Sequence, residues 1–531
     1  MSIPEPTSQK RILFGISFSW GRYFLAMLLG ILQAPVLFAN LENAELGIWF
    51  LFFSFSSFLA LTDLGLSQVL GRAVSYLWGK DQDQERGEQP EIAAFYGQAG
   101  FMDLLLSALS SFAVIVVLGG GLSWGFLRFY LVRLGLGQVL LDRLWVALPV
   151  FLLGALLQML ANILLKGLSG LGDVDWENSI RGGSQAVWFA LLIVFVPRYP
   201  NIITLCILYV IRSLAMALLA WLCLKLRHAG YLAQRGRVQI GLIRRMLKES
   251  WPIFVTQLGA WFILEINLVV AGAFFGAEVL PNLAILRQMI QVGITLAAAI
   301  PIAVQPFASA AFSVGDEGRV RMLYMRAVRL ALVIGGGWMV GVLVWPAEIL
   351  DLWVGAGHFL GYSVLIPLVV TGFLEFHHVS HSYFVWSAGK WPFAPWALAA
   401  GVLNVIFISV GSYFFGLEGL VLGTMLAQML TNNWYAVYYP LRQLGMGIRK
   451  YFQTVALLTI AYLAVVAAAA LGLKFVIERV IAHDALSLLA GALLTAGVGL
   501  LAAWILVAAE EERAAAKNAW RELILRTRKR A

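Results

Sequence analysis

Charged residues are scarce in this sequence. Only 13% of its 531 residues are Asp, Glu, Lys or Arg, about half the share of a typical soluble domain, while 61% are hydrophobic. The apolar residues come in blocks of about 20, the length at which a helix crosses a bilayer. The sequence lacks the period-two alternation over about 10 residues that marks a membrane β-barrel. It therefore predicts an all-α polytopic membrane protein.

Cysteines and nucleotide-binding motifs are also scarce. Cys206 and Cys223 share one predicted helix, where a rise of about 1.5 Å per residue separates them by roughly 25 Å, too far for a disulfide. The Walker A, G-x-S-x-G and H-E-x-x-H patterns are missing. We therefore expect no cofactor, no metal and no catalytic residue. Any work across the membrane would then draw its energy from an H⁺ or Na⁺ gradient, from the membrane potential, or from a downstream reaction.

About fourteen segments are apolar and long enough to serve as membrane spans. They are 14–38, 46–70, 97–119, 144–165, 184–197, 202–224, 249–272, 282–306, 327–346, 363–388, 393–415, 419–439, 452–472 and 485–507. The fifth is short, and we expect it to begin earlier. Residues 120–143 form the longest predicted external loop, in which we expect a helix at the membrane surface.

The basic residues predict the orientation of the chain. One side of the membrane carries 28 of the 38 Lys and Arg, the other side carries six, and four lie in or at the ends of spans. Because basic residues favour the cytoplasmic side, both termini are expected in the cytoplasm. The net charge of +9 follows from this asymmetry, so nucleic acid is not an expected partner.

The two halves of the chain resemble each other. Ala44-Glu45 and Ala277-Glu278 open the second span of each half, and Gly79-Lys80-Asp81 and Gly315-Asp316-Glu317 follow its end. Because both halves begin on the same side, the repeat is parallel, with a pseudo-two-fold axis along the membrane normal. Six plus six plus two spans is typical of a transporter.

This repeat divides the chain into five predicted parts. They are an N-terminal six-helix bundle (1–224), a basic cytoplasmic linker (225–248), a C-terminal six-helix bundle (249–441), two additional transmembrane helices (442–508) and a basic cytoplasmic tail (509–531).

Three arginines lie within predicted spans: Arg22, Arg212 and Arg287, the last sharing a stripe with Gln291. Ionisable residues at this depth usually face a cavity. Arginine stays charged, and its planar guanidinium suits phosphate. These four residues are candidates for a cationic substrate-binding site. Alternatively, the arginines neutralise carboxylates of neighbouring helices, for example Glu265.

Carboxylates and histidines in the spans are candidates for ion or proton coupling. Glu265 shares a helix face with Gln257 and Trp261, and Glu375 shares one with His378 in GFLEFHHVSHSYF. Desolvation would let such groups carry a proton, although polar packing is the alternative. The pair His377 and His381 has a spacing that also suits a metal, but the sequence offers it no further ligands.

The stretch LTDLGLSQVLGR places Asp63 and Arg72 nine residues apart at the end of an apolar run. On a straight helix they face opposite sides, so each needs its own partner. Asp103, early in the third span, is a candidate partner for Arg72.

The longer segment ALTDLGLSQVLGRAVSYLWGKDQ resembles the end of the second helix of polysaccharide-export flippases. These are the Wzx-like O-antigen and teichuronic-acid transporters of the multidrug/oligosaccharidyl-lipid/polysaccharide superfamily. Ala277-Glu278, Pro301 and Gly315-Asp316 fit the same pattern. The resemblance implies a MATE-like fold of two bundles with a central cavity that opens alternately to each side. It also implies movement of an undecaprenyl-diphosphate-linked oligosaccharide from the inner to the outer leaflet of the bacterial cytoplasmic (inner) membrane.

The resemblance further implies roles for individual residues. Arg22, Arg212 and Arg287 would hold the diphosphate and sugar, and Asp63, Gly65 and Arg72 would form a bend and gate near the cytoplasmic entry. The substrate would serve lipopolysaccharide O-antigen or exopolysaccharide synthesis, with membrane lipids and polysaccharide-assembly proteins as partners. Nothing in the sequence requires more than a monomer. The peptidoglycan-precursor branch has denser basic residues in its first two helices and is therefore disfavoured.

Two other functions compete with this one. An ion-coupled multidrug or cation antiporter of the same superfamily would need an acidic cavity, which Glu265, Glu375 and Asp63 permit but the arginines oppose. A membrane polysaccharide polymerase or ligase would need a large external catalytic loop, and none is predicted. We therefore expect a transporter and not an enzyme.

Overall fold

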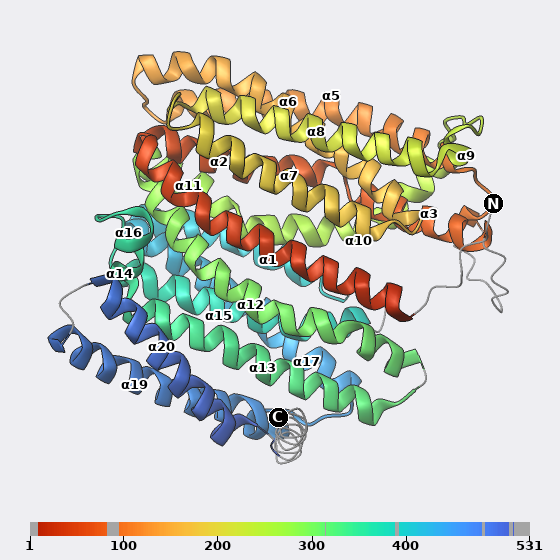
Figure 1. Cartoon of the computed structure of the whole chain (residues 1–531). Helices are drawn as coiled ribbons and strands as arrows, with labels where there is room; N and C mark the ends of the chain where they lie inside the picture. Colours follow the sequence, from red (N-terminus) through yellow and green to blue (C-terminus); the bar gives the residue numbers. More distant parts are fainter. Residues whose placement is uncertain are drawn as a thin grey trace, which may run out of the picture. The chain divides into compact units, whose positions relative to one another are not determined.

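The computed structural model describes residues 9–81, 95–313, 315–387, 392–480, 484–508 and 513. In these ranges the backbone consists of helices, turns and short connections, without a strand (Figure 1). The described residues contain eleven helical segments that are long and apolar enough to cross a membrane. The protein is therefore an all-α polytopic membrane protein, as predicted. The predicted tail, 509–531, lies outside the described residues except for Arg513.

The chain forms two compact units. The first unit comprises residues 1–284 and 397–405, and the second comprises 285–396 and 406–531. Residues 249–284, which the repeat assigns to the C-terminal bundle, thus pack within the first unit. The predicted five-part division rests on the repeat in the sequence and stays a prediction.

The helices up to residue 279 belong to the first unit. They are α1 (Gln9–Asn40), α2 (Asn43–Thr62), α3 (Leu66–Asp81), α5 (Phe101–Arg133), α6 (Gln138–Gly170), α7 (Val174–Phe195), α8 (Ile202–Arg227), α9 (Ala229–Leu232), α10 (Ile240–Leu264), α11 (Ile266–Phe275) and η1 (Ala277–Val279).

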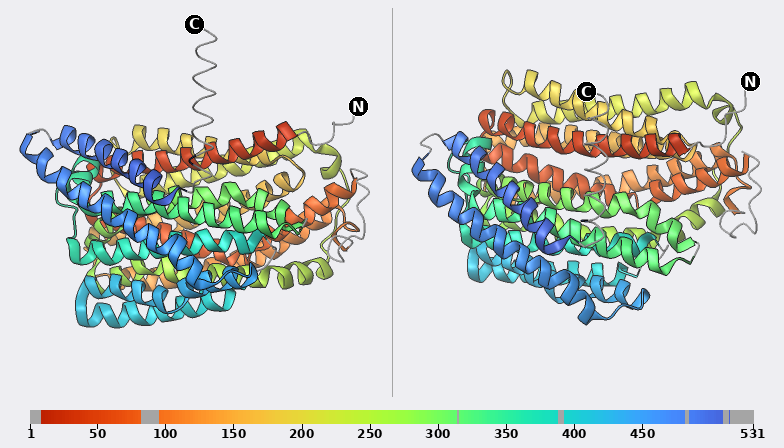
Figure 2. Two further views of the ribbon diagram at one scale, coloured as in Figure 1. Left: turned by 90° about the horizontal axis from the view of Figure 1, so that it is seen from below. Right: turned by 60° about the horizontal axis from the view of Figure 1, so that its bottom comes forward.

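The remaining helices belong wholly or mainly to the second unit. They are α12 (Leu280–Ser313), α13 (Glu317–Val344), α14 (Pro346–Val354), α15 (Tyr362–Ser387), α16 (Ala394–Leu430), α17 (Asn432–Gln443), α18 (Ile448–Tyr451), η2 (Phe452–Ala456), α19 (Leu457–Val480), α20 (Asp484–Ala502) and η3 (Ala503–Val507). Helices α19 and α20 lie side by side in every view (Figure 1, Figure 2).

The fourteen predicted spans fall on helices. The single segment Ala394–Gln443 contains two of them, and the short fifth span belongs to α7, which begins earlier, as expected. The prediction of a long external loop at 120–143 is wrong. Helix α5 runs through Gly119, Gly120, Gly121 and Gly125 to Arg133, and α6 begins at Gln138. The chain turns only at Gly135, whose φ is 65°.

Aromatic contacts join α2, α6 and α8 in the first unit. Tyr209 of α8 stacks on Phe151 of α6 with ring centroids 5.6 Å apart. Its hydroxyl lies 3.0 Å from that of Ser56 on α2. A buried tyrosine needs such a hydrogen bond, and the bond fixes the ring. These contacts also fix the next turn of α8, which carries Arg212.

Glycines let the two halves of α16 approach closely. Gly416 adopts φ 64° and ψ −145° between them, a conformation open to glycine. A Cβ atom on Gly411 would lie 2.2 Å from the carbonyl oxygen of Gly419, and one on Gly419 would lie 2.0 Å from that of Gly411. Small residues at such a crossing give membrane helices the close packing that holds them together.

Gly411→Ala is therefore expected to lower the free energy of unfolding by about 1–3 kcal/mol, because the methyl group overpacks the crossing. Thermal unfolding of the detergent-purified protein measures the change. Gly472 on α19 is the matched control, since a Cβ atom there meets nothing within 4 Å. Gly472→Ala should leave the melting temperature unchanged or raise it. Equal melting temperatures for wild type and Gly411→Ala would contradict the close crossing.

Candidate functional site

Three arginines of the first unit lie on helices that pack together. Arg22 is on α1, Arg181 on α7 and Arg212 on α8, and α7 packs against both α1 and α8. The Cγ atom of Arg22 lies 3.8 Å from where a Cβ atom of Gly182 would be. The charge of Arg181 acts on Arg212. Arg181 thus links the two predicted residues, and we call Arg22, Arg181 and Arg212 the arginine cluster.

Arg181 is held in place by two neighbours. Its Nη1 donates to Oδ1 of Asn162 at 2.8 Å, and its Nε donates to the carboxylate of Glu177 at 3.0 Å. Glu177 also accepts from Lys166 at 2.8 Å. One buried carboxylate therefore stands against two cations here, which leaves the site with excess positive charge.

The sequence analysis did not include Arg181 in the site. It placed the start of the fifth span at residue 184, so Arg181 was counted among the basic residues of a loop. Helix α7 in fact begins at Val174. The signal that identifies Arg181 is its i, i+4 pairing with Glu177 at the start of an apolar run, which favours a helix.

Arg212 lies near the middle of α8 and is half-buried. Its Nε is buried without a hydrogen-bond partner among the described residues. Gln158 of α6 also has a buried polar atom without a hydrogen-bond partner in the described part of the chain, its Oε1. Its amide nitrogen lies 3.8 Å from the sulfur of Met216, which follows Arg212 by one turn of α8. Buried polar atoms are nearly always hydrogen-bonded in proteins. These two atoms therefore have unused hydrogen-bonding capacity within the described residues.

The predicted residues Arg287 and Gln291 belong to the second unit, on α12. Arg287 is half-buried and Gln291 is exposed. The hydroxyl of Thr295 donates to the carbonyl oxygen of Gln291 at 2.8 Å.

The predicted bend in the second span is confirmed. Helix α2 ends at Thr62 and α3 begins at Leu66. Between them Leu64 has φ 53° and Gly65 has φ 77°. The carboxylate of Asp63 accepts from the backbone N–H of Ser67 at 3.2 Å, which caps the first turn of α3.

Arg72 pairs with Glu249 on α10 at 3.1 Å, and Arg245 donates to the same carboxylate at 2.9 Å. The predicted pairing of Arg72 with Asp103 is wrong. Asp103 instead accepts from the backbone N–H of Arg237 at 2.8 Å, because the basic linker folds back onto the start of α5.

Glu265 stands where α10 ends and α11 begins. Its carbonyl oxygen accepts from the hydroxyl of Ser54 on α2 at 2.8 Å, and the indole of Trp261 donates to the carbonyl oxygen of Ser54 at 3.1 Å. These two bonds tie the interruption to α2. The carboxylate of Glu265 is half-buried and has no hydrogen-bond or ion-pair partner in the described ranges, so it is available to a cation.

In the second unit, Glu375 accepts from Gln428 at 3.2 Å, and His378 lies 3.1 Å from the hydroxyl of Ser382. No group of three or more His, Cys, Asp or Glu suited to a metal occurs among the described residues.

No protein-family model and no curated protein matches this chain. Among solved structures, the lipid II flippase MurJ in an inward closed conformation is 16% identical with a TM-score of 0.63, over 96% of this chain and 100% of that chain.

Transporters of the MATE family are similar too. An inward-facing multidrug resistance MATE transporter of the MOP superfamily is 15% identical with a TM-score of 0.63, over 80% of this chain and 94% of that one. A variant of the Vibrio cholerae MATE transporter VcmN is 13% identical with a TM-score of 0.56, over 81% and 96%. At these identities the likeness shows the fold. This chain is a multi-pass membrane protein with the fold of MurJ and of the MATE transporters.

Proposed function

We propose that the chain is a flippase. It moves an undecaprenyl-diphosphate-linked oligosaccharide from the inner to the outer leaflet of the bacterial cytoplasmic membrane by alternating access, with both termini in the cytoplasm. The observation that carries this proposal is the arginine cluster, in which the Nε of Arg212 is buried without a hydrogen-bond partner in the described part of the chain. A guanidinium binds phosphate oxygens with charge-assisted hydrogen bonds, and the open Oε1 of Gln158 suits a sugar hydroxyl.

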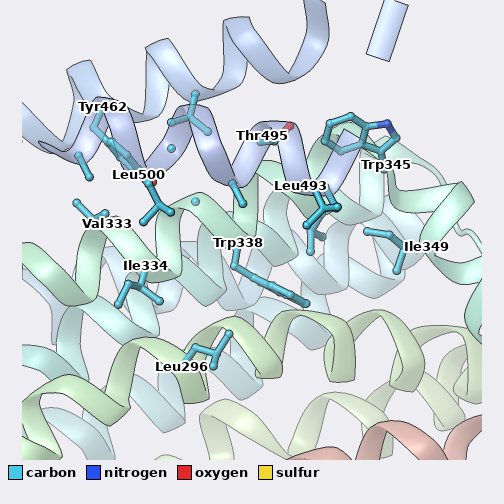
Figure 3. Close-up of a pocket in the computed structure, with 18 of the residues that line it drawn as sticks. Leu296, Val333, Ile334, Trp338, Trp345, Ile349, Tyr462, Leu493, Thr495 and Leu500 are labelled. Atoms are coloured by element: carbon cyan, nitrogen blue, oxygen red, sulfur yellow. The ribbon is translucent and has the colours of Figure 1, made fainter. Parts of the chain in front are cut away.

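An apolar cavity in the second unit supports a lipid-linked substrate. It has a volume of about 670 Å³ and lies between α13, α14, α19 and α20 (Figure 3). Leu296, Ile334 and Trp338 line one side, and Leu493 and Leu500 of α20 line the other (Figure 3). A cavity of this size and composition suits an apolar ligand. A polyprenyl chain gains free energy by lying in it.

The remaining predicted residues receive roles in the same cycle. Glu265, Glu375 and His378 are proposed to take up the coupling ion, H⁺ or Na⁺. Asp63 and Gly65 are proposed to form the hinge of a cytoplasmic gate, which the Arg72–Glu249 ion pair helps to hold. The product would feed the assembly of O-antigen or another surface polysaccharide.

Ion-coupled efflux of cationic drugs is the second candidate. The carboxylate of Glu265, which no protein group neutralises within the described ranges, favours it. The arginine cluster opposes it, because a desolvated cation beside three guanidinium groups would be repelled.

The test is the sidedness of the lipid-linked oligosaccharide in cells that lack this protein. A reagent confined to the outer face labels the outer pool, and surface polysaccharide is assayed in parallel. We expect the oligosaccharide to accumulate on the inner leaflet and the surface polymer to disappear. Normal sidedness and normal polymer would refute the flippase and leave efflux as the leading function.

A further inference from the structure

Four side chains of the second unit, three of them buried and His377 half-buried, form one continuous chain of hydrogen bonds. The hydroxyl of Tyr324 on α13 lies 2.6 Å from Nδ1 of His381 on α15. Nε2 of His381 lies 3.3 Å from Nε2 of His377, and Nδ1 of His377 lies 3.2 Å from Oδ1 of Asn433 on α17. Tyr324 and His381 are completely buried. The hydroxyl of Tyr451 on α18 bridges the chain, at 3.1 Å from each histidine Nε2.

One assignment of the histidine tautomers satisfies this chain with Oδ1 of Asn433 facing His377. Oδ1 of Asn433 accepts, so Nδ1 of His377 carries a hydrogen and Nε2 of the neutral ring is an acceptor. Nε2 of His381 must then donate to it, which leaves Nδ1 of His381 to accept from the hydroxyl of Tyr324. All four groups are neutral, and every bond uses one hydrogen.

This arrangement has room for one added proton and not for two. The added proton binds Nε2 of His377, the acceptor nitrogen at the centre of the chain. Two N–H groups then face each other across the 3.3 Å gap, and their direct hydrogen bond is lost. Each must turn to the oxygen of Tyr451. Proton uptake therefore changes how α15 contacts α18.

The surroundings of the pair are neutral. Helix α13 contributes Tyr324, α17 contributes Asn433 and α18 contributes Tyr451, and neither histidine has an ion pair among the described residues. On α15 itself the titratable neighbours are Glu375, which is bonded to Gln428, and His378, which is bonded to Ser382. A proton on the pair thus places a new charge in a buried site, and such a site favours a change of conformation that rehydrates it.

We infer that His377 and His381 form the binding site for one transported proton, through which a pH gradient drives the proposed translocation. This inference rests on the proposed function, because it names the coupling ion and its site. It places the coupling proton on this pair in place of Glu265, Glu375 and His378, with Tyr324, Asn433 and Tyr451 as positioning residues. The proton arrives at and leaves from Nε2 of His377, and no covalent bond between heavy atoms changes.

The test uses the full-length protein in liposomes that contain an undecaprenyl-diphosphate-linked oligosaccharide. With one proton per cycle, each pH unit across the membrane is worth 1.36 kcal/mol and shifts the ratio between leaflets about tenfold. We expect this shift for wild type. His377→Gln should still equilibrate the lipid but leave the ratio near one. His358→Gln, in the connection between α14 and α15, is the control and should behave like wild type.

A shift that persists in His377→Gln, or a wild-type ratio indifferent to pH, would overturn the proton site while the flippase stands. If wild type translocates nothing, the proposed function fails, and a second measurement still decides the site. Potentiometric titration of the purified protein should show one proton fewer bound by the His377→Gln, His381→Gln double variant. If the double variant bound two protons fewer than wild type, or the same number, the inference would be overturned. Stoichiometric zinc in the purified wild-type protein would also overturn it.

Discussion

Arg212→Gln is expected to abolish substrate translocation while leaving the protein folded. Loss of a buried, charged hydrogen-bonding partner of a phosphate costs about 2–4 kcal/mol, which is roughly 30- to 1,000-fold in rate. We expect the fold to tolerate the change, because the Nε of Arg212 is buried without a hydrogen-bond partner among the described residues. Removing an uncompensated buried charge should keep the melting temperature or raise it.

This combination separates a ligand-binding residue from a structural one. Transport is measured as the rate at which lipid-linked oligosaccharide reaches the outer leaflet, and stability as the melting temperature of the purified protein. Arg128 is a suitable control, because it is exposed and its guanidinium lies over the ring of Trp145 at 5.4 Å. Arg128→Gln should transport normally. A destabilised Arg212→Gln protein, or one that transports at the wild-type rate, would remove Arg212 from the site.

Asp173→Asn is expected to lower the free energy of unfolding by about 2–3 kcal/mol. Asp173 lies in the connection between α6 and α7 with only 5% of its surface exposed. Its carboxylate accepts from Arg227 at 2.7 and 2.9 Å and contacts Nε2 of His228 at 2.7 Å. These bonds tie the start of α7 to the end of α8, and thereby position the helices that carry Arg181 and Arg212.

The effect has a defined pH dependence. Burial raises the pKa of Asp173, but the hydrogen bonds from His228 and Arg227 outweigh it and lower the pKa to about 2, below the ordinary 3.8. A carboxyl group whose folded-state pKa is lowered stabilises the protein above its unfolded pKa and loses that effect as pH falls. The difference in melting temperature between wild type and Asp173→Asn should thus be fully developed at neutral pH.

The same difference should shrink as the pH falls from about 4 towards 2. Asp175, two residues along the same turn, forms no ion pair in the described ranges and provides the control. Asp175→Asn should leave the melting temperature unchanged. A melting temperature of Asp173→Asn equal to that of wild type at neutral pH would show that the tie does not stabilise the unit.

Hydropathy alone predicted the membrane class and the helical segments on which the predicted spans fall, because each span must satisfy its own backbone hydrogen bonds and therefore forms a long apolar run. The bend at residues 63–65 was also predictable, since a short polar and glycine interruption of an apolar run marks a break. The break after Leu264 was not, because no glycine or proline stands there. The bonds of Ser54 to Glu265 and Trp261, which stabilise it, join residues about 210 positions apart.

The contacts of the candidate site were less predictable than its charges. Arg22 and Arg212 are visible as charges inside apolar runs, whereas Arg181 is hidden at a helix start. The i, i+4 spacing of His377 and His381 is likewise visible. Their role depends on Tyr324 and Tyr451, which come from helices distant in sequence. Such long-range pairings leave no local pattern in a single sequence.

The most direct test of the proposed flippase function is translocation by the purified protein alone. Liposomes carry an undecaprenyl-diphosphate-linked oligosaccharide in both leaflets, and an impermeant reagent modifies the outer pool over time. We expect wild-type protein to make nearly the whole pool accessible. Protein-free liposomes should stop at the outer half, and Arg212→Gln should expose the inner half roughly 30- to 1,000-fold more slowly than wild type. Wild-type protein that leaves the inner pool protected, yet exchanges a cationic dye across the same membrane, would contradict the account.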